Sequence, residues 1–304
     1  MTTRVEVDVG GRRLSLSNLD KVLWPRPGLT KRWLVDYYAA VAPALLRHAG
    51  AQPVTLHRFP DGVEGPHFYE TRAPARPGWV QTVTFRMART GKVFDVVVLA
   101  DEATLVWAAQ LAAVEIHPYL APAAALDRPA TMVFDLDPGA PATLVECCRV
   151  ARCLRDVLDG MGLRSWPKTS GGLGLHVVVP LHSDATYERT KAFARAAALL
   201  LERDRPGEVT SSMPLARRTG RVFVDWSQND PGKSTVAAWS LRGFQVPTVA
   251  LPVTWDEVDE VARTADARPL WSYAGDALRR LESGDPMVEA ATLRQTLPSF
   301  DPSR

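Results

Sequence analysis

The sequence predicts an α+β protein whose sheet is mainly antiparallel. Helix-like and strand-like segments are mixed along the 304 residues without the strict strand–helix alternation of a parallel sheet. The strand-like runs are short and are often flanked by glycine, proline or aspartate. No repeat of fixed period is visible. A composition of 46% hydrophobic and 23% charged residues is typical of a soluble globular chain.

The first part of the chain predicts a small α/β lobe. Alternating runs on either side of a Gly-Gly pair, "VEVDV" and "RLSLS", predict an opening hairpin. A helix is expected over residues 30–50, with Thr30 as its N-cap and Pro43 as a kink or a break. The remaining elements expected in this part are strands near 54–59, 79–86 and 93–98, and a helix over 101–116 capped by Asp101.

The second part predicts the core of the sheet. It begins with a strand at "TMVFDL" and a long helix that opens with Pro141. The elements expected after these are a strand over 175–181, a helix over 186–202, strands over 221–226 and 234–241, and an acidic helical end from Thr254. We expect one domain over 1–304, consisting of an N-terminal lobe (about 1–126), a core (127–252) and a C-terminal segment (253–304).

Composition restricts the cellular setting. No apolar segment approaches the length of a membrane span, and the N-terminus lacks the apolar core of a signal peptide, so we expect a cytoplasmic protein with no membrane partner. The three cysteines match no zinc spacing and no disulfide framework. Residues 4–32 hold seven basic side chains against three acids, whereas residues 254–304 hold ten acids against six bases. This asymmetry suits a polyanion bound on one face, although ordinary solvated surface explains it as well.

Two aspartates stand where the pattern asks for a buried strand. In "TMVFDLDPG", side chains of a strand alternate between faces, so Asp135 and Asp137 project the same way near the strand end. Asp225 follows another apolar run, in "RVFVDWSQ". Three carboxylates can hold two hard divalent cations, Mg²⁺ or Mn²⁺, which clamp the attacking and leaving oxygens of a phosphoryl transfer. The alternative is a polar strand end and a turn before a proline.

A glycine loop precedes one of the expected strands. "KTSGGLGLHVVVPL" places Ser170 and three glycines before a strand that contains His176. Backbone N–H groups of such a loop suit an anion such as a triphosphate, but a tight turn before a buried histidine fits equally well. Two further patterns are rejected: "GGLGLHV" lacks the third glycine of a dinucleotide fingerprint, and "DPGKST" lacks the first glycine of a Walker A loop.

The motifs together resemble a known family. "FDLDPG", "TSGGLGLHVVVPL" and "VFVDWSQN" with "STVAAWSLR" are similar, in this order, to the three motif regions of archaeo-eukaryotic primase-type polymerases. The polymerase domain of bacterial ATP-dependent DNA ligase D matches best, and "LSNLDKVLWP" and "PVTWDEVD" also resemble it. The resemblance covers nearly the whole chain. It implies a primase-polymerase fold with an RRM-like catalytic half.

The resemblance implies an enzyme and its site. The activity is a template-directed nucleotidyltransferase that fills gaps and extends DNA ends in non-homologous end joining, using NTPs or dNTPs with a preference for ribonucleotides. Its partners are DNA ends or gaps bearing a 5′-phosphate, a Ku-type end-binding protein and an ATP-dependent ligase, with nucleoid association on DNA. The implied residues are Asp135, Asp137 and Asp225 for two divalent cations (Mn²⁺ or Mg²⁺) and catalysis; Ser170, His176, His117, Arg218, Gln228, Arg242 and His57 for the nucleotide; Asn18, Lys21 and Lys31 for the 5′-phosphate; Phe68 and Tyr69 for stacking.

Two positions depart from the family pattern. Leu173, inside the glycine loop, and His57 stand where the family usually has lysine. Each change removes a point charge that would face a triphosphate. Neither change touches the three aspartates.

Two other functions compete with the polymerase. One is a catalytically weak relative that binds DNA ends through the 5′-phosphate, and the other is a metal-dependent phosphoesterase. No Lys-x-Asp-Gly ligase signature is present, so no ligase or nuclease domain is expected. Met1 and the polar end "SFDPSR" favour a stand-alone polymerase over a module of a larger ligase.

Overall fold

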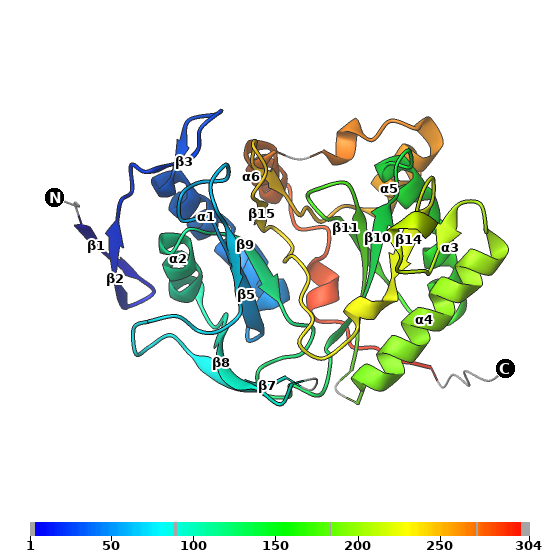
Figure 1. Ribbon diagram of the computed structural model, residues 1–304, viewed down its shortest axis with the longest axis horizontal. Helices are drawn as coiled ribbons and strands as arrows, with labels where there is room; N and C mark the ends of the chain where they lie inside the picture. The colour runs from blue at the N-terminus through cyan, green and yellow to red at the C-terminus, as the bar shows by residue number, and fades with distance from the viewer. Residues whose placement is uncertain (1–3, 88–89, 183, 272, 299–304) are drawn as a thin grey trace. The chain divides into compact units, whose positions relative to one another are not determined.

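The computed structural model describes residues 4–87, 90–182, 184–271 and 273–298. Contacts divide the chain into two compact units (Figure 1). The first unit comprises Met1–Tyr119, Ser234–Val249 and Tyr273–Gly284. The second unit comprises Leu120–Lys233, Ala250–Ser272 and Asp285–Arg304. The first boundary lies close to the one expected near residue 126, and segments after residue 233 contribute to both units.

The first unit contains a five-stranded antiparallel sheet of order β6-β5-β8-β7, in which β9 also pairs with β5. The predicted opening hairpin is present as β1 and β2, and helices α1 and α2 pack against each other (Figure 1). The elements are β1 (Arg4–Val9), β2 (Arg12–Ser17), β3 (Val22–Trp24), β4 (Leu29–Thr30), α1 (Lys31–Ala49), β5 (Pro53–Arg58), β6 (Phe68–Glu70), β7 (Thr82–Arg86), β8 (Val93–Val98), α2 (Glu102–Gln110), β9 (Ala113–Pro118), β15 (Leu241–Arg242), β16 (Thr248–Val249) and α6 (Ala274–Glu282).

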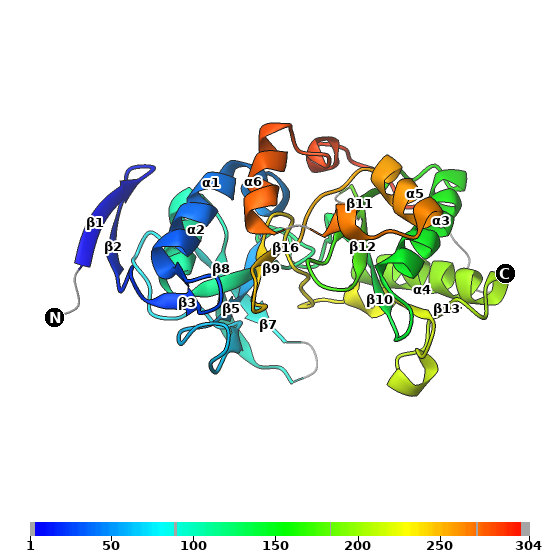
Figure 2. The same ribbon diagram turned by 90° about the horizontal axis from the view of Figure 1, so that it is seen from above.

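The second unit contains a five-stranded sheet of order β11-β12-β10-β14-β13, antiparallel except for the β13–β14 pair. Helices α3 and α4 both contact β10, and α5 packs against α3 (Figure 2). The elements are β10 (Thr131–Pro138), α3 (Leu144–Gly160), β11 (Trp166–Thr169), β12 (Leu175–Pro180), α4 (Tyr187–Asp204), β13 (Val209–Thr210), β14 (Val222–Asp225), α5 (Trp255–Thr264) and the short 3₁₀ turns η1 (Leu215–Arg217), η2 (Trp226–Gln228), η3 (Arg268–Leu270) and η4 (Val288–Ala291).

The predicted α+β class with mainly antiparallel sheets is confirmed, although several details differ from prediction. Pro43 does not divide α1, because residues on both sides of it, such as Tyr38 and Leu45, are fully buried in the core. The helix expected over 101–116 ends at Gln110, and the chain continues as β9. The apolar run there fits a buried strand as well as a helix, and pairing with β5 decides between them.

The strand expected over 234–241 is also wrong. Trp239 has a φ of 68°, which is incompatible with an extended strand, and only Leu241–Arg242 pair with β16. The sequence reading missed β11, which contains Pro167. This strand lies at the sheet edge, where a proline is tolerated. In the part of the chain that the structure describes, every helix is too short or too polar to cross a membrane.

Candidate functional site

The three predicted aspartates meet on neighbouring strands of the second unit. Asp135 and Asp137 lie on β10, and Asp225 ends β14. The antiparallel register places Asp135 directly opposite Asp225 and Asp137 opposite Phe223. Phe134 and Leu136 alternate with the two aspartates along β10 and are fully buried. The alternation of the strand therefore directs both aspartates to the other, more open face. This juxtaposition is the one that the sequence hypothesis requires.

Mutual repulsion marks this site electrostatically. Partial burial and the adjacent charge of Asp135 raise the pKa of Asp137 to about 7, and Asp225 adds to the effect. Arg218 opposes it, with Nη1 3.9 Å from Asp137 Oδ2. Three carboxyl groups on one face are the oxygen-only ligand set that hard divalent cations prefer, and a bound cation would relieve the repulsion. The residues present therefore fit a magnesium or manganese site.

This repulsion predicts a pH-dependent gain of stability in Asp137→Asn. The folded pKa of Asp137 is raised above its unfolded value, so the native state loses stability as pH rises from about 4 to about 7. In chelator at pH 8, the asparagine variant should be more stable by about 1 kcal/mol, a modest value because the side chain is half exposed and water screens it. Chemical denaturation at pH 4 and pH 8 measures the difference. An equal effect at both pH values, or a matching gain in Asp204→Asn, would contradict the repulsion.

The glycine loop lies next to these aspartates. Ser170 Oγ accepts hydrogen bonds from the N–H groups of Gly172 (3.2 Å) and Gly174 (3.1 Å). A Cβ added to Gly174 would come within 2.6 Å of the carbonyl oxygen of Leu136 and 3.6 Å of Asp137 Oδ1. Only glycine therefore allows the loop to approach β10 this closely. His176, on β12, has its Nε2 3.2 Å from Asp135 Oδ1.

Arg218 and Gln228 complete the surroundings of the aspartates. The Arg218 guanidinium lies 3.7 Å above the ring of Phe223 and donates to the carbonyl oxygen of Met213. Gln228 Nε2 donates to Asp225 Oδ2 (3.0 Å), while Ser227 donates to Oδ1 through its N–H and Oγ. Hydrogen bonds thus hold Asp225 in one orientation before any ligand is present.

A second cluster of predicted residues lies in the first unit around a carboxylate. Glu115 Oε2 is 2.8 Å from His117 Nε2 and 3.2 Å from His57 Nδ1, and Oε1 is 3.2 Å from Arg242 Nε. Both histidines and the arginine are predicted from the sequence, whereas Glu115 is not. Alternation in "AVEIHP", had it been read as a strand, would have placed Glu115 and His117 on one face.

The electrostatics of this cluster follow from its burial. Burial alone would raise the pKa of Glu115, but the hydrogen bond from His117 and the neighbouring His57 and Arg242 hold it well below its usual value. Burial lowers the pKa of His117 more than Glu115 raises it. Glu115 is therefore ionised and His117 neutral at neutral pH.

The predicted aromatic pair lies beside the same cluster. Tyr69 stacks on the ring of His57, with centroids 3.9 Å apart and planes at 17°. Phe68, its neighbour on β6, is exposed and has the Arg58 guanidinium 5.4 Å from its ring centroid. More than half of the Tyr69 surface is exposed, so both rings are open to a flat partner.

The three residues assigned to a 5′-phosphate also come together in the first unit. The N–H of Lys21 donates to the carbonyl of Asn18, and the N–H of Lys31 donates to the carbonyl of Lys21. Lys21 Nζ pairs with Asp61 (2.8 Å), and Lys31 Nζ donates to the carbonyl of Gln110. Burial, together with the nearby charge of Lys21, lowers the pKa of Lys31 to about 8. A phosphate at this position would restore the charge balance of the buried lysine.

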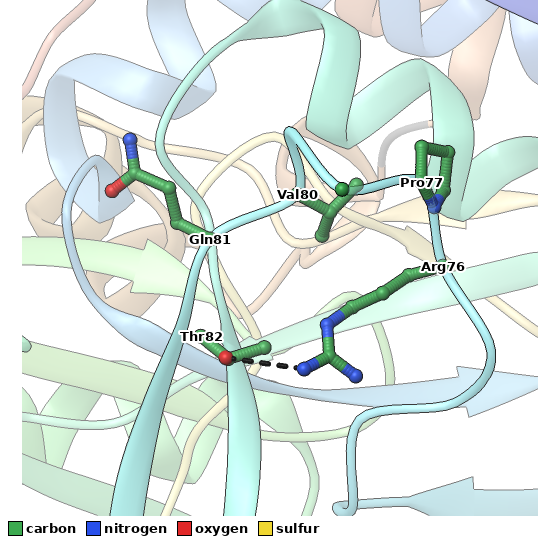
Figure 3. Close-up of a pocket in the computed structure, with 6 residues that line it drawn as sticks. Arg76, Pro77, Val80, Gln81 and Thr82 are labelled. Carbon is green, nitrogen blue, oxygen red and sulfur yellow. Dashed lines mark hydrogen bonds between the residues drawn. The ribbon is translucent and has the colours of Figure 1, made fainter.

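A separate pocket of about 550 Å³ in the first unit involves none of these residues. It is lined by Arg76, Pro77, Gly78, Val80, Gln81 and Thr82 (Figure 3). The Arg76 guanidinium donates to Thr82 Oγ1 (3.3 Å) and lies 3.7 Å from Asp95. The Arg76 charge is therefore paired within the first unit, and we assign no ligand to this pocket.

Comparison with known proteins identifies the family. The family model described as LigD, primase-polymerase domain, matches residues 30–287. The multifunctional non-homologous end joining DNA repair protein LigD of Mycobacterium tuberculosis is 39% identical over 295 residues, which cover 92% of this chain and 38% of that protein. The LigD protein of Pseudomonas aeruginosa is 32% identical, over 93% of this chain and 33% of that protein.

A solved structure supports the same family. The polymerase domain from Mycobacterium tuberculosis ligase D, in complex with DNA, aligns with a TM-score of 0.85 at 36% identity and covers 93% of this chain and 99% of that one. The family model and these relatives define the class of the protein, a nucleotidyltransferase of the primase-polymerase type. The chain belongs to the LigD primase-polymerase domain family. The chain spans about 38% of the length of the mycobacterial relatives.

Proposed function

We propose that this chain is a template-directed polymerase that fills gaps and extends ends of broken DNA during non-homologous end joining. The observation that carries the proposal is the pairing of Asp135 with Asp225 across two strands, with Asp137 on the same face. Family membership supports the reaction class, and the DNA-bound structure of the mycobacterial domain supports DNA as the partner. The proposed substrates are gapped or broken DNA with a 5′-phosphate and an NTP or dNTP, with ribonucleotides preferred.

The proposed mechanism assigns a role to each group near the aspartates. Asp135, Asp137 and Asp225 would hold two divalent cations, Mn²⁺ or Mg²⁺, which stabilise charge on the attacking hydroxyl and on the departing pyrophosphate. Gln228 and Ser227 orient Asp225, and His176 is within reach of Asp135. The N–H groups of the glycine loop and the Arg218 guanidinium supply positive potential for a triphosphate. His57, His117 and Arg242 lie in the first unit, and the proposal that they bind the nucleotide rests on the family resemblance.

One assay separates this proposal from its two competitors. Intact protein is incubated with gapped DNA bearing a 5′-phosphate, Mn²⁺ and each nucleotide in turn. Primer extension that disappears in Asp137→Ala supports the polymerase. Binding of gapped DNA without extension identifies an end-binding relative, and shortening of the primer identifies a phosphoesterase.

The 5′-phosphate assignment predicts a selective loss in Lys21→Ala. Hydrogen bonds to charged groups contribute about 1.5–3 kcal/mol, so binding to 5′-phosphorylated gaps should weaken about tenfold or more. Binding to gaps that end in a 5′-hydroxyl should change little. Fluorescence anisotropy on the two DNAs at one salt concentration measures the difference, with Lys92→Ala as a control for general loss of positive charge. Equal losses on both DNAs would refute the assignment.

Leu173 predicts a gain of affinity on restoring the family lysine. Its side chain is two-thirds exposed at the tip of the glycine loop. In Leu173→Lys, an ammonium should lower the KM for the nucleotide about three- to fivefold, because an exposed charge pair contributes about 1 kcal/mol at most. Steady-state kinetics measure the effect, and Leu199→Lys on the exposed side of α4 is the matched control. An equal decrease of KM in the control would assign the effect to net charge.

We also propose the partners that this reaction needs. A ligase must seal the filled gap, and a Ku-type end-binding protein would hold the two DNA ends while the polymerase acts. The LigD proteins of Mycobacterium tuberculosis and Pseudomonas aeruginosa are each more than twice the length of this chain and are named as multifunctional end-joining proteins. Association with the nucleoid in the cytoplasm follows from DNA binding.

A further inference from the structure

We propose that His57, Glu115 and His117 form a binding site for a transition-metal ion such as Zn²⁺ in the first unit. This site is additional to the three aspartates and uses His57 and His117, which the proposed function assigns to the nucleotide. The three side chains come from one face of the β5–β9 ladder. His57 pairs directly with Glu115 in the antiparallel register, and His117 lies two residues further along β9.

The donor atoms already lie close to one another. One ligand atom from each residue lies within 4.8 Å of those from the other two. Ligand atoms held about 2.1 Å from one tetrahedral ion are roughly 3.4 Å apart. The Nδ1 of His57 and the Nε2 of His117 lie 3.2 and 2.8 Å from Glu115 Oε2, so a small outward movement would admit the ion.

One buried nitrogen of the cluster lacks an aligned hydrogen bond. His57 Nδ1 is buried and close to Glu115, but it makes no aligned hydrogen bond. Its side chain is only 7% exposed, so water does not readily replace the missing partner. A metal ion among the three donors would give this nitrogen a partner, which Glu115 in its present orientation does not.

The groups behind the donors orient them for metal binding. His67 Nδ1 lies 2.8 Å from His57 Nε2, which leaves Nδ1 to face Glu115. The N–H of Gly243 donates to Glu115 Oε1 (2.9 Å), and Arg242 lies against the same oxygen, which leaves Oε2 for an ion. Outer contacts of this kind commonly fix the orientation of metal ligands.

The chemistry of the donors selects the class of metal. Two imidazole nitrogens and one carboxylate suit Zn²⁺ and its neighbours rather than Mg²⁺ or Ca²⁺. Three protein ligands leave a fourth position for water or an anion.

The test measures metal binding by the full chain without using polymerase activity. Asp137→Asn serves as the background, because it weakens the competing aspartate site. We expect calorimetric titration to give one Zn²⁺ per chain, and Co²⁺ to give the strong visible bands of a tetrahedral site. The double variant Asp137→Asn/His57→Lys removes one ligand and places an ammonium group beside Glu115.

In the double variant, Zn²⁺ affinity should fall at least about 100-fold and the Co²⁺ bands should vanish. His117→Gln in the same background should do the same, and His67→Ala should weaken binding about 10- to 100-fold. His182→Ala is the control for a histidine outside the cluster. Thermal unfolding in chelator shows whether each variant is folded, and the comparison uses those that are. Unchanged affinity in both folded ligand variants, or no tetrahedral Co²⁺ spectrum in the background, would overturn the site.

Discussion

Replacing Asp225 with asparagine should reduce nucleotide incorporation about a thousandfold or more. The substitution keeps the size of the side chain and the acceptor that Ser227 uses, but it removes one of the three charges that would hold the divalent cations. A thousandfold loss corresponds to ~4 kcal/mol of transition-state stabilisation, a reasonable share for metal-assisted phosphoryl transfer. Single-turnover primer extension with saturating Mn²⁺ measures the rate of incorporation itself.

The loss should be specific to the site. Asp230→Asn removes a neighbouring surface carboxylate that pairs with Lys191, and it should leave the rate within about twofold. Raising Mn²⁺ should restore little activity to Asp225→Asn, since the asparagine cannot replace the charge. Activity near that of the intact protein would show that Asp225 does not take part in the reaction.

Gly139→Ala should destabilise the second unit by about 3 kcal/mol or more. A Cβ at this position would lie 2.0 Å from the carbonyl oxygen and 2.9 Å from the Cβ of Arg218. Backbone hydrogen bonds hold the two segments together here. The N–H of Gly139 donates to the carbonyl oxygen of Arg221, and its carbonyl oxygen accepts from the N–H of Gly220. The clash is with main-chain atoms, so rotation of a side chain does not relieve it.

The same substitution should disturb the chemistry before it unfolds the protein. The positive charge of Arg218 lowers the pKa of Asp137, and displacing Arg218 would remove this effect. Chemical denaturation measures the stability, with Gly160→Ala as the matched control. That glycine ends α3 and has open space around it, so alanine should be neutral or slightly stabilising. Similar stabilities for the two variants would contradict the predicted clash.

Much of the fold could be predicted from local patterns. Alternation and glycines were sufficient for the opening hairpin and for β10. Thr30 and Asp101 were correctly placed at the N-caps of α1 and α2, although only the Asp101 side chain makes a capping hydrogen bond. The errors lie where local patterns are ambiguous. The apolar end of the helix expected over 101–116 suits a buried strand equally well, and nothing local announces the positive φ of Trp239 that interrupts the expected strand.

The site divides in the same way. The shared face of Asp135 and Asp137 follows from the period of a strand. The position of Asp135 opposite Asp225 depends on the long-range pairing of β10 with β14, which sequence alone could support only through family resemblance. Glu115 was missed because its strand had been assigned to a helix, where Glu115 and His117 would not share a face. The roles of the predicted site residues as ligands of metal, nucleotide or phosphate remain predictions.

The order in which the chain builds its two units has a consequence for inheritance. Residues 234–249 return to the first unit after the second has been largely built, and Tyr37 and Tyr38 anchor them through hydrogen bonds to Trp239 and Ser240. No single cut therefore yields two self-sufficient halves. A gene fusion made at the first boundary would leave the first unit without residues 234–249 and 273–284, so a longer repair protein gains a complete fold only when both units are transferred together.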